Sequence, residues 1–192
     1  MFSIAWILAV SFGSRILLSY ETTPGQVGIV AQNWPDSRIQ RASGRATLVM
    51  LAHPHCPCTR ASVGELAQIM ADAQGRVSAY VLFLKPEGSE AGWEKTDLWR
   101  SAEAIPGVTA LPDPDGAEAR RFGVETSGHA VLFDNDGRLL FSGGITSSRG
   151  HSGDNAGRSA IASLLNNHAA ERARTSVFGC SLVDSRQIAD KR

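Results

Sequence analysis

The stretch of sequence that decides the fold is ATLVMLAHPHCPCTRASVGELAQIM, residues 46–70. It begins with a continuous apolar run over residues 46–51, typical of a strand buried on both faces. It ends with a segment in which Val63, Leu66 and Ile69 recur at helical spacing. Between them lie two of the chain's three cysteines and two of its five histidines. A thiol between a strand and a helix start is favoured as thiolate by the unpaired N–H groups and the helix dipole.

The composition indicates a folded domain without affinity for nucleic acid. The 192 residues are enough for one domain of ordinary size with short appendages. Nineteen basic and nineteen acidic residues give a formal net charge of zero, and no basic run is present, which excludes nucleic acid as an expected partner. Three cysteines are too few for a disulfide-rich scaffold, and the closeness of Cys56 to Cys58 favours reactive or metal-binding thiols.

The N-terminal residues 1–20 are expected to form a membrane anchor. Their apolar run has about the 20 residues that a helix needs to cross a bilayer, and Arg15 lies near enough to one end to snorkel. No basic residue precedes the run, so charge gives little help with orientation. We expect a single-pass protein of the bacterial inner membrane whose soluble domain faces the periplasm. A cleaved signal peptide and a buried soluble helix are the alternatives.

The remainder divides into a linker (21–44), a domain (45–172) and an irregular tail (173–192). The linker is polar, contains prolines and glycines, and has room for a short strand near residues 27–30. In the domain, hydrophobic patterns predict strands at 46–51, 77–84 and 108–111, and helices at 59–73, 93–104 and 117–122.

A hairpin and a closing helix complete the predicted domain. Asp136-Gly137 separates apolar runs over 129–134 and 138–144, and this dipeptide between two such runs is a strong hairpin signal. Asp154 or Asn155 can cap a helix that extends to Arg172. The pattern predicts an α/β fold, with a central mixed sheet between helices.

Over residues 46–165 the chain resembles the thioredoxin-like superfamily. The resemblance rests on the cysteine segment after the first core strand and on the hairpin preceded by Gly123-Val124. It extends to the membrane-anchored, extracytoplasmic thiol-disulfide proteins and the RedB-type group. It implies a three-layer sandwich that exchanges disulfides with protein thiols or disulfides and needs no cofactor.

Two departures from the superfamily pattern stand out. Thioredoxins carry Cys-x-x-Cys, whereas here one residue separates Cys56 from Cys58. Thr59 occupies the second cysteine position if Cys56 is the first, and His55 occupies the first position if Cys58 is the second. The cis-proline that usually precedes the hairpin strand is missing, and its place falls at about Gly128.

The spacing suggests which thiol attacks. Pro57 suits the first helical position, which makes Cys56 the N-cap and the nucleophile, with Cys58 as the resolving thiol. A disulfide between the two would close a small ring, strain its torsions and be oxidising. Neighbouring side chains add positive charge or proton-accepting capacity that lowers the thiol pKa; these are His53, His55 and Arg60.

Two other functions stay open at this point. One is copper or zinc binding, for which soft and borderline donors are available at His53, His55, Cys56 and Cys58. Neighbouring side chains diverge, so such a site would need a distant ligand, for which the candidates are His129, His151 and Cys180. The other is a non-catalytic interaction domain.

Three further features lie outside the cysteine motif. The glycine-rich loop over residues 142–155 carries Arg149 and His151, which can bind an anionic group at a helix N-terminus; the alternative is a surface loop. His129 opens a core strand and is expected near the cysteines, unless it is a hydrogen-bonded structural histidine. Cys180 is interpreted as a packed apolar thiol rather than a third redox centre.

Overall fold

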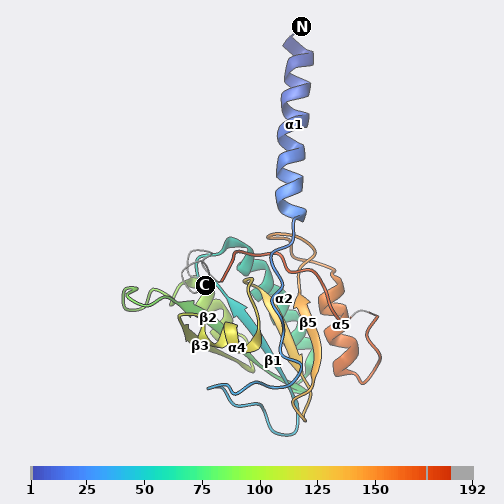
Figure 1. Ribbon diagram of the computed structural model, residues 1–192. Coiled ribbons are helices and arrows are strands. Elements are labelled where there is room, and N and C mark those ends of the chain that lie inside the picture. Colours follow the sequence, from blue (N-terminus) through green and yellow to red (C-terminus); the bar gives the residue numbers. More distant parts are fainter. Residues whose placement is uncertain (1, 172, 183–192) are drawn as a thin grey trace.

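A five-stranded mixed sheet forms the centre of the computed structural model, which describes residues 2–171 and 173–182 (Figure 1). Its strands are β1 (Ala46–Ala52), β2 (Val77–Lys85), β3 (Val108–Pro114), β4 (His129–Phe133) and β5 (Leu139–Gly144). The spatial order is β3-β2-β1-β4-β5. β1, β2 and β3 run parallel, while β4 is antiparallel to β1 and β5 is antiparallel to β4. The mixed sheet predicted from the sequence is confirmed and is consistent with a thioredoxin-like fold.

The central strand β1 is buried because both faces of the sheet are covered. Leu48 and Met50 point into one hydrophobic cluster, whereas Val49 and Leu51 point into a second cluster on the opposite face. All four side chains are fully buried. A strand in this position has no solvent-facing side, which explains the unbroken apolar run.

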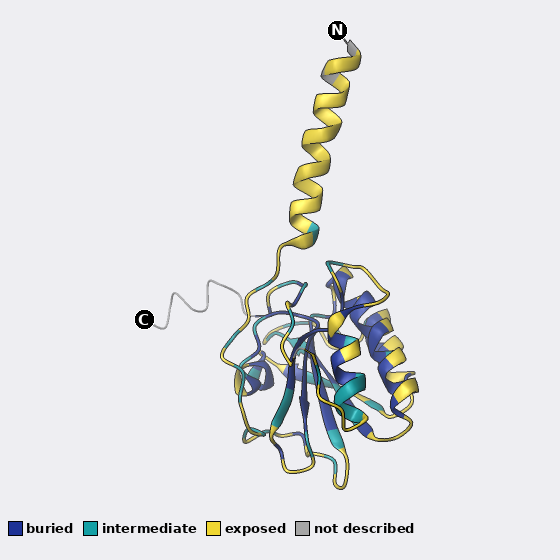
Figure 2. Cartoon of the chain, turned by 90° about the vertical axis from the view of Figure 1, so that its right-hand side faces the viewer, coloured by how far each residue is buried: buried dark blue, intermediate teal, exposed yellow. Residues whose placement is uncertain are grey.

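Helices lie on both faces of the sheet and make a three-layer domain (Figure 1). α2 (Pro57–Ala73), α3 (Asp97–Glu103) and α5 (Ala156–Leu165) supply side chains to the first cluster. α4 (Ala117–Phe122) supplies Ala119 and Phe122 to the second. The buried residues of α2 and α5 face the sheet and their exposed residues face outward (Figure 2).

Two helices are shorter than predicted. The helix expected from residue 93 begins at Asp97, because residues 90–96 form turns such as the one closed by Lys95 N–H and the Gly92 carbonyl at 2.8 Å. The closing helix ends at Leu165 instead of continuing toward residue 172, which lies outside the described residues. Asn167 takes a left-handed conformation with a φ of 58°, which a helix cannot continue through.

The residues expected to form a linker pack against the domain instead. Leu139 N–H donates to the Gln32 carbonyl at 2.9 Å, and an isolated bridge joins Asn33 to Arg138. Trp34 packs edge-on against Phe122, with ring centroids 5.3 Å apart. The short α4 leaves part of its sheet face open, and this segment covers it. The short strand expected near residues 27–30 is not formed.

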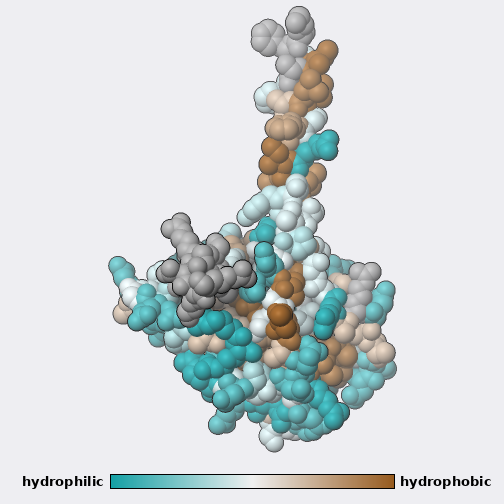
Figure 3. All heavy atoms as spheres, in the orientation of Figure 1, coloured by the Kyte–Doolittle hydropathy of each residue, from teal (hydrophilic) through white to brown (hydrophobic). Residues whose placement is uncertain are grey.

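The N-terminal helix α1 (Phe2–Thr22) projects away from the domain (Figure 1). Its described side chains are exposed along most of its length (Figure 2) and many are apolar (Figure 3). Within the described part of the chain, no helix has both the length and the apolar character needed to cross a membrane.

Two glycines of the helical layer predict opposite effects of the same substitution. Gly64 lies in α2, and a Cβ added there would meet nothing within 4 Å, so Gly64→Ala should raise the free energy of unfolding by about 0.5–1 kcal/mol. A Cβ at Gly157 in α5 would clash with the Gly144 carbonyl oxygen, so Gly157→Ala should lower it by about 1–3 kcal/mol. Urea denaturation of both variants measures these effects. Equal effects of the same sign would contradict this packing.

Candidate thiol site

Cys56 forms the turn between β1 and α2. It is the N-cap of α2 in an extended conformation, and proline follows in the first helical turn. Its N–H donates to the His53 carbonyl at 3.1 Å, while its carbonyl accepts from Thr59 N–H at 3.0 Å. The N-cap position predicted from Pro57 is therefore confirmed. The side chain of Cys56 is buried, with 1% of its residue surface exposed.

The surroundings distinguish the two thiols of the motif. Burial by itself raises the pKa of the Cys56 thiol, but hydrogen bonds from Cys180 and Thr59 outweigh it and hold the pKa below its ordinary value. Burial and the adjacent Cys56 sulfur raise the pKa of Cys58, with Arg149 acting in the opposite direction. Cys56 is consequently the thiol with more thiolate character at neutral pH.

The structure brings the third cysteine to the same site. The Cys180 side chain lies within hydrogen-bonding reach of Cys56, and its carbonyl accepts from Ser127 N–H at 2.8 Å. Burial and the neighbouring Cys56 raise the pKa of the Cys180 thiol to about 12. Cys180 is half-buried, and all three cysteines are free thiols. From the sequence, Cys180 is expected to be a packed apolar thiol and is named beside the motif only as a distant ligand of the metal alternative, because tertiary contacts alone bring its irregular segment to the helix start.

The loop before β4 connects to the cysteine turn through Ser127. Its Oγ accepts from His53 N–H at 2.8 Å and lies 2.8 Å from Thr59 Oγ1. Gly128, at the place expected for the cis-proline, has a φ of 83°, and its N–H donates to the Leu51 carbonyl. Within residues 2–171 and 173–182 no peptide bond is cis.

The two motif histidines gather around Trp93 instead of around a sulfur. The His55 ring lies 4.5 Å from the Trp93 ring, and its Nε2 is 3.2 Å from the Trp93 carbonyl oxygen. His53 Nδ1 accepts from His55 N–H at 3.2 Å. Burial, and then the nearby His55, lower the pKa of His53. His53 thus stays neutral to a lower pH than an ordinary histidine, and the positive charge expected from it is absent at neutral pH.

Arg149 is the member of the glycine-rich loop that reaches the thiols. Its Nη1 donates to the Gly179 carbonyl at 2.6 Å, and its charge favours the thiolates of Cys58 and Cys180. His151 Nε2 instead lies 3.7 Å from the carboxylate of Glu21, at the end of α1. The structure thus separates two side chains that the sequence analysis grouped as one anion-binding pair.

Arg60 belongs to a helix contact. It forms an ion pair with Asp97, which connects the start of α2 to the start of α3. Both side chains are more than half exposed, at 64% and 52%, so solvent screens their interaction. The role expected for Arg60 beside the thiols has no support in this contact.

His129 is buried in the sheet. Its Nε2 lies 2.8 Å from Ser142 Oγ on β5, and its Nδ1 has no hydrogen-bond partner among the residues that the structure describes. Burial lowers the pKa of His129 to about 4. These contacts fit the structural alternative for this residue.

The donors of the metal alternative are dispersed. In the described part of the chain, no group of three or more histidine, cysteine, aspartate or glutamate side chains is arranged to hold an ion. The imidazoles of His53 and His55 already contact Trp93. The metal alternative therefore stays a prediction that the structure does not support.

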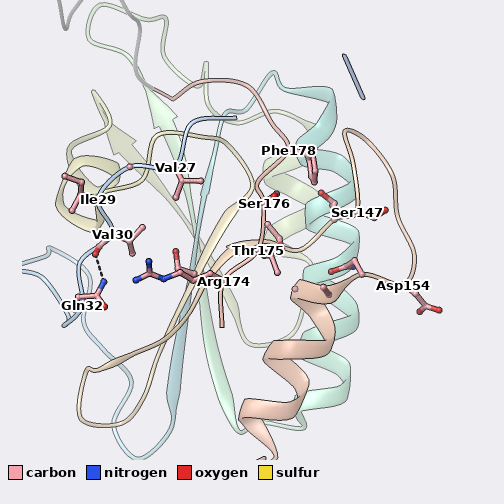
Figure 4. Close-up of a pocket in the computed structure, with 17 residues that line it drawn as sticks. Val27, Ile29, Val30, Gln32, Ser147, Asp154, Arg174, Thr175, Ser176 and Phe178 are labelled. Atoms are coloured by element: carbon pink, nitrogen blue, oxygen red, sulfur yellow. Dashed lines mark hydrogen bonds between the residues drawn. The ribbon is translucent and has the colours of Figure 1, made fainter. Parts of the chain in front are cut away.

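A groove of about 950 Å³ lies beside the edge strand β5 (Figure 4). One wall is the segment containing Val27 and Ile29, and the other includes Asp154 near the start of α5. Between these walls the groove is lined by Arg174, Thr175, Ser176 and Phe178. The segment that carries Cys180 to Cys56 thus also forms part of this groove.

The comparisons with known proteins concern the fold. No family model matches the chain, and no curated protein matches it. An uncharacterized conserved protein from Geobacillus kaustophilus has a TM-score of 0.62 at 19% identity, over 85% of this chain and 93% of its own. A hypothetical protein from Sinorhizobium meliloti 1021 has a TM-score of 0.60 at 18% identity, over 86% and 98%. The exposed lipoprotein thioredoxin of Streptococcus pneumoniae TIGR4 has a TM-score of 0.47 at 18% identity, over 65% and 86%.

The lowered pKa of His129 predicts acid sensitivity. An unfolded histidine binds a proton near pH 6.5, while the folded one resists it until about pH 4. The stabilisation is therefore full above pH 6.5 and falls, by up to about 3 kcal/mol, as the pH drops toward 4. His129→Asn should flatten this loss in denaturation measured between pH 7 and pH 4.5. The exposed His168, replaced by Asn, is the control; an unchanged slope in His129→Asn would contradict the assignment.

Proposed function

We propose that this protein is a thiol-disulfide oxidoreductase that acts on protein thiols or disulfides through Cys56. The observation that supports this most is the contrast at the start of α2, where the pKa of Cys56 is lowered and the pKa of Cys58 is raised. A thiolate is the nucleophile of disulfide exchange, and a thiol of low pKa is also a good leaving group. The Cys-Pro-Cys motif therefore contains one reactive thiolate, Cys56, and one thiol that stays protonated, Cys58.

Reduction of a partner disulfide proceeds in two exchange steps. The Cys56 thiolate attacks one sulfur of a partner disulfide, a mixed disulfide forms, and the second partner sulfur leaves as a thiolate. A second thiol of this protein loses its proton, attacks Cys56 and releases the first partner sulfur. Two protein thiols are oxidised and one partner disulfide is reduced. The sequence makes Cys58 the first candidate for this second thiol, and the reverse sequence oxidises a partner dithiol.

We further propose that α1 attaches the domain to the inner membrane with the thiol site on the periplasmic side. Large apolar side chains project from this helix, including Trp6, Leu8 and Phe12, which are 70%, 65% and 69% exposed. An apolar surface of this extent normally contacts a membrane or a protein. Disulfide chemistry also suits the oxidising conditions outside the cytoplasm.

Substitution of Cys56 tests the redox proposal. Cys56→Ser should slow reduction of glutathione disulfide by about 100-fold, because a hydroxyl does not ionise at neutral pH. Cys58→Ser should still form the mixed disulfide. In that variant, iodoacetamide should label Cys56 with a pH midpoint below that of an ordinary cysteine, since the thiolate appears as the pH rises through a lowered pKa. Unchanged thiols together with stoichiometric copper(I) or zinc binding would contradict the proposal and favour the metal alternative.

Vesicle flotation tests the attachment. The full chain should float with vesicles of phosphatidylethanolamine and phosphatidylglycerol, and the double substitution Leu8→Asp with Phe12→Asp should abolish flotation. Ile29→Asp is a matched control, because Ile29 is 97% exposed on the domain. Full-length protein that stays at the bottom of the gradient would refute the attachment.

A further inference from the structure

The C-terminal segment, residues 174–182, is held along the domain although it forms no helix and no strand. Gly25 N–H donates to the Val177 carbonyl, and Leu182 N–H donates to the Glu125 carbonyl, each at 2.8 Å. An isolated antiparallel bridge joins Thr126 to Ser181. These backbone contacts fix the segment on both sides of Cys180.

Gly179 sets how closely this segment approaches the cysteine turn. A Cβ at this position would clash with the Ser127 carbonyl oxygen, so only glycine fits without displacement. Arg149 Nη1 donates to the Gly179 carbonyl at 2.6 Å from the other side. The next residue, Cys180, lies within hydrogen-bonding reach of Cys56.

Ser127 couples the two cysteines. Its N–H donates to the Cys180 carbonyl at 2.8 Å, while its Oγ contacts the backbone of His53 and the hydroxyl of Thr59. His53 and Thr59 are the two residues whose backbone closes the Cys56 turn. One serine therefore fixes the positions of both thiols.

We propose that Cys180 is the internal disulfide partner of Cys56 and the sulfur that external thiols meet. The proposal rests on the redox function proposed above and deepens it. Cys56 is only 1% exposed, whereas Cys180 is half-buried and keeps part of its residue surface exposed. The oxidised site is a Cys56–Cys180 disulfide, which clamps the C-terminal segment over the start of α2. The substrate class is a protein dithiol that becomes a disulfide.

The Cys56–Cys180 disulfide oxidises a partner dithiol in two exchange steps. A partner thiolate attacks the Cys180 sulfur, the Cys56–Cys180 bond breaks, and Cys56 leaves as a thiolate. The partner's second thiol loses its proton and attacks its own bridged sulfur, so Cys180 leaves and takes up a proton. The partner dithiol has lost two electrons to the protein disulfide. Cys180 is the sulfur that is attacked because it is the more exposed of the two. Cys56 is the leaving group because its thiolate is the more stable.

Charge also favours Cys180 as the resolving thiol when the protein reduces a partner disulfide. In the reduced protein the neighbouring Cys56 is one of the causes that raise the pKa of Cys180. Once Cys56 carries a partner sulfur its charge is gone, so this obstacle to deprotonation disappears, while burial and the nearby Cys58 still raise the pKa of Cys180 and Arg149 lowers it. Cys58 offers a small, strained ring instead, because one residue separates it from Cys56.

Peptide mapping tests the assignment on the full chain. After oxidation by glutathione disulfide and alkylation, trypsin cleaves at Arg45, Arg60, Arg174 and Arg186, so Cys56 and Cys58 share peptide 46–60 while Cys180 lies in peptide 175–186. We expect these two peptides to be joined in the wild type and in Cys58→Ser, and separate in Cys56→Ser. A disulfide confined to 46–60, with Cys180 alkylated, would overturn the inference.

Two variants separate placement from folding. Gly179→Ala keeps all three thiols but displaces the segment, and should require roughly tenfold more oxidised glutathione for half-maximal joining. Gly64→Ala, in open space on α2, should behave as the wild type. An unchanged midpoint in a Gly179→Ala protein that melts as the wild type does would overturn the placement.

The rate of glutathione disulfide reduction, measured together with the peptide map, distinguishes failure of the proposed function from failure of the role of Cys180. If Cys56→Ser reduces glutathione disulfide as fast as the wild type, the proposed function itself fails. If Cys56→Ser is inactive, while Cys180→Ser retains the wild-type rate and the wild type never joins the two peptides, only the role of Cys180 fails.

Discussion

The hydrogen bonds of Ser127 are the constraint on which the thiol site depends. This residue precedes β4, yet it contacts the turn after β1 and the C-terminal segment. A strand end, a helix start and an irregular tail segment are thus held together by one small polar side chain and its backbone. Its N–H and its Oγ both have partners, so these hydrogen bonds fix the position of the loop and, through it, the positions of the thiols.

The element types could be read from the sequence because each has a local cause. The apolar run of β1, the helical spacing of α2 and the Asp-Gly turn between β4 and β5 are short-range signals, and the sheet they predict is formed. Pro57 likewise fixed the N-cap in advance, since its ring suits only the first turn of a helix. The two misplaced helix ends, predicted at residues 93 and 172 and observed at 97 and 165, depend on turn conformations that hydrophobic spacing does not encode.

The composition of the site was harder to predict because it depends on long-range contacts. Cys180 and Arg149 reach Cys56 and Cys58 from segments far away in the chain, and neither belongs to a recognisable motif. Conversely, proximity in sequence misled for His53, His55 and Arg60. Their side chains turn toward Trp93 and Asp97, because aromatic stacking and an ion pair were available there. Neighbours in sequence at a helix start diverge in space.

The packing of residues 24–42 determines how far the domain can stand from α1. A flexible linker of 24 residues would place the domain at a root-mean-square distance of roughly 25–30 Å from the end of the helix. In the structure Gly25 N–H donates to the Val177 carbonyl, and Arg149 donates to the carbonyls of Tyr20 and Thr23. The junction between α1 and the domain is therefore held in place, and the surface to which α1 binds sets the distance of the thiol site from that surface. Under the proposed redox function, partner proteins must come to that level, because the contacts at this junction leave the domain little freedom to reach toward them.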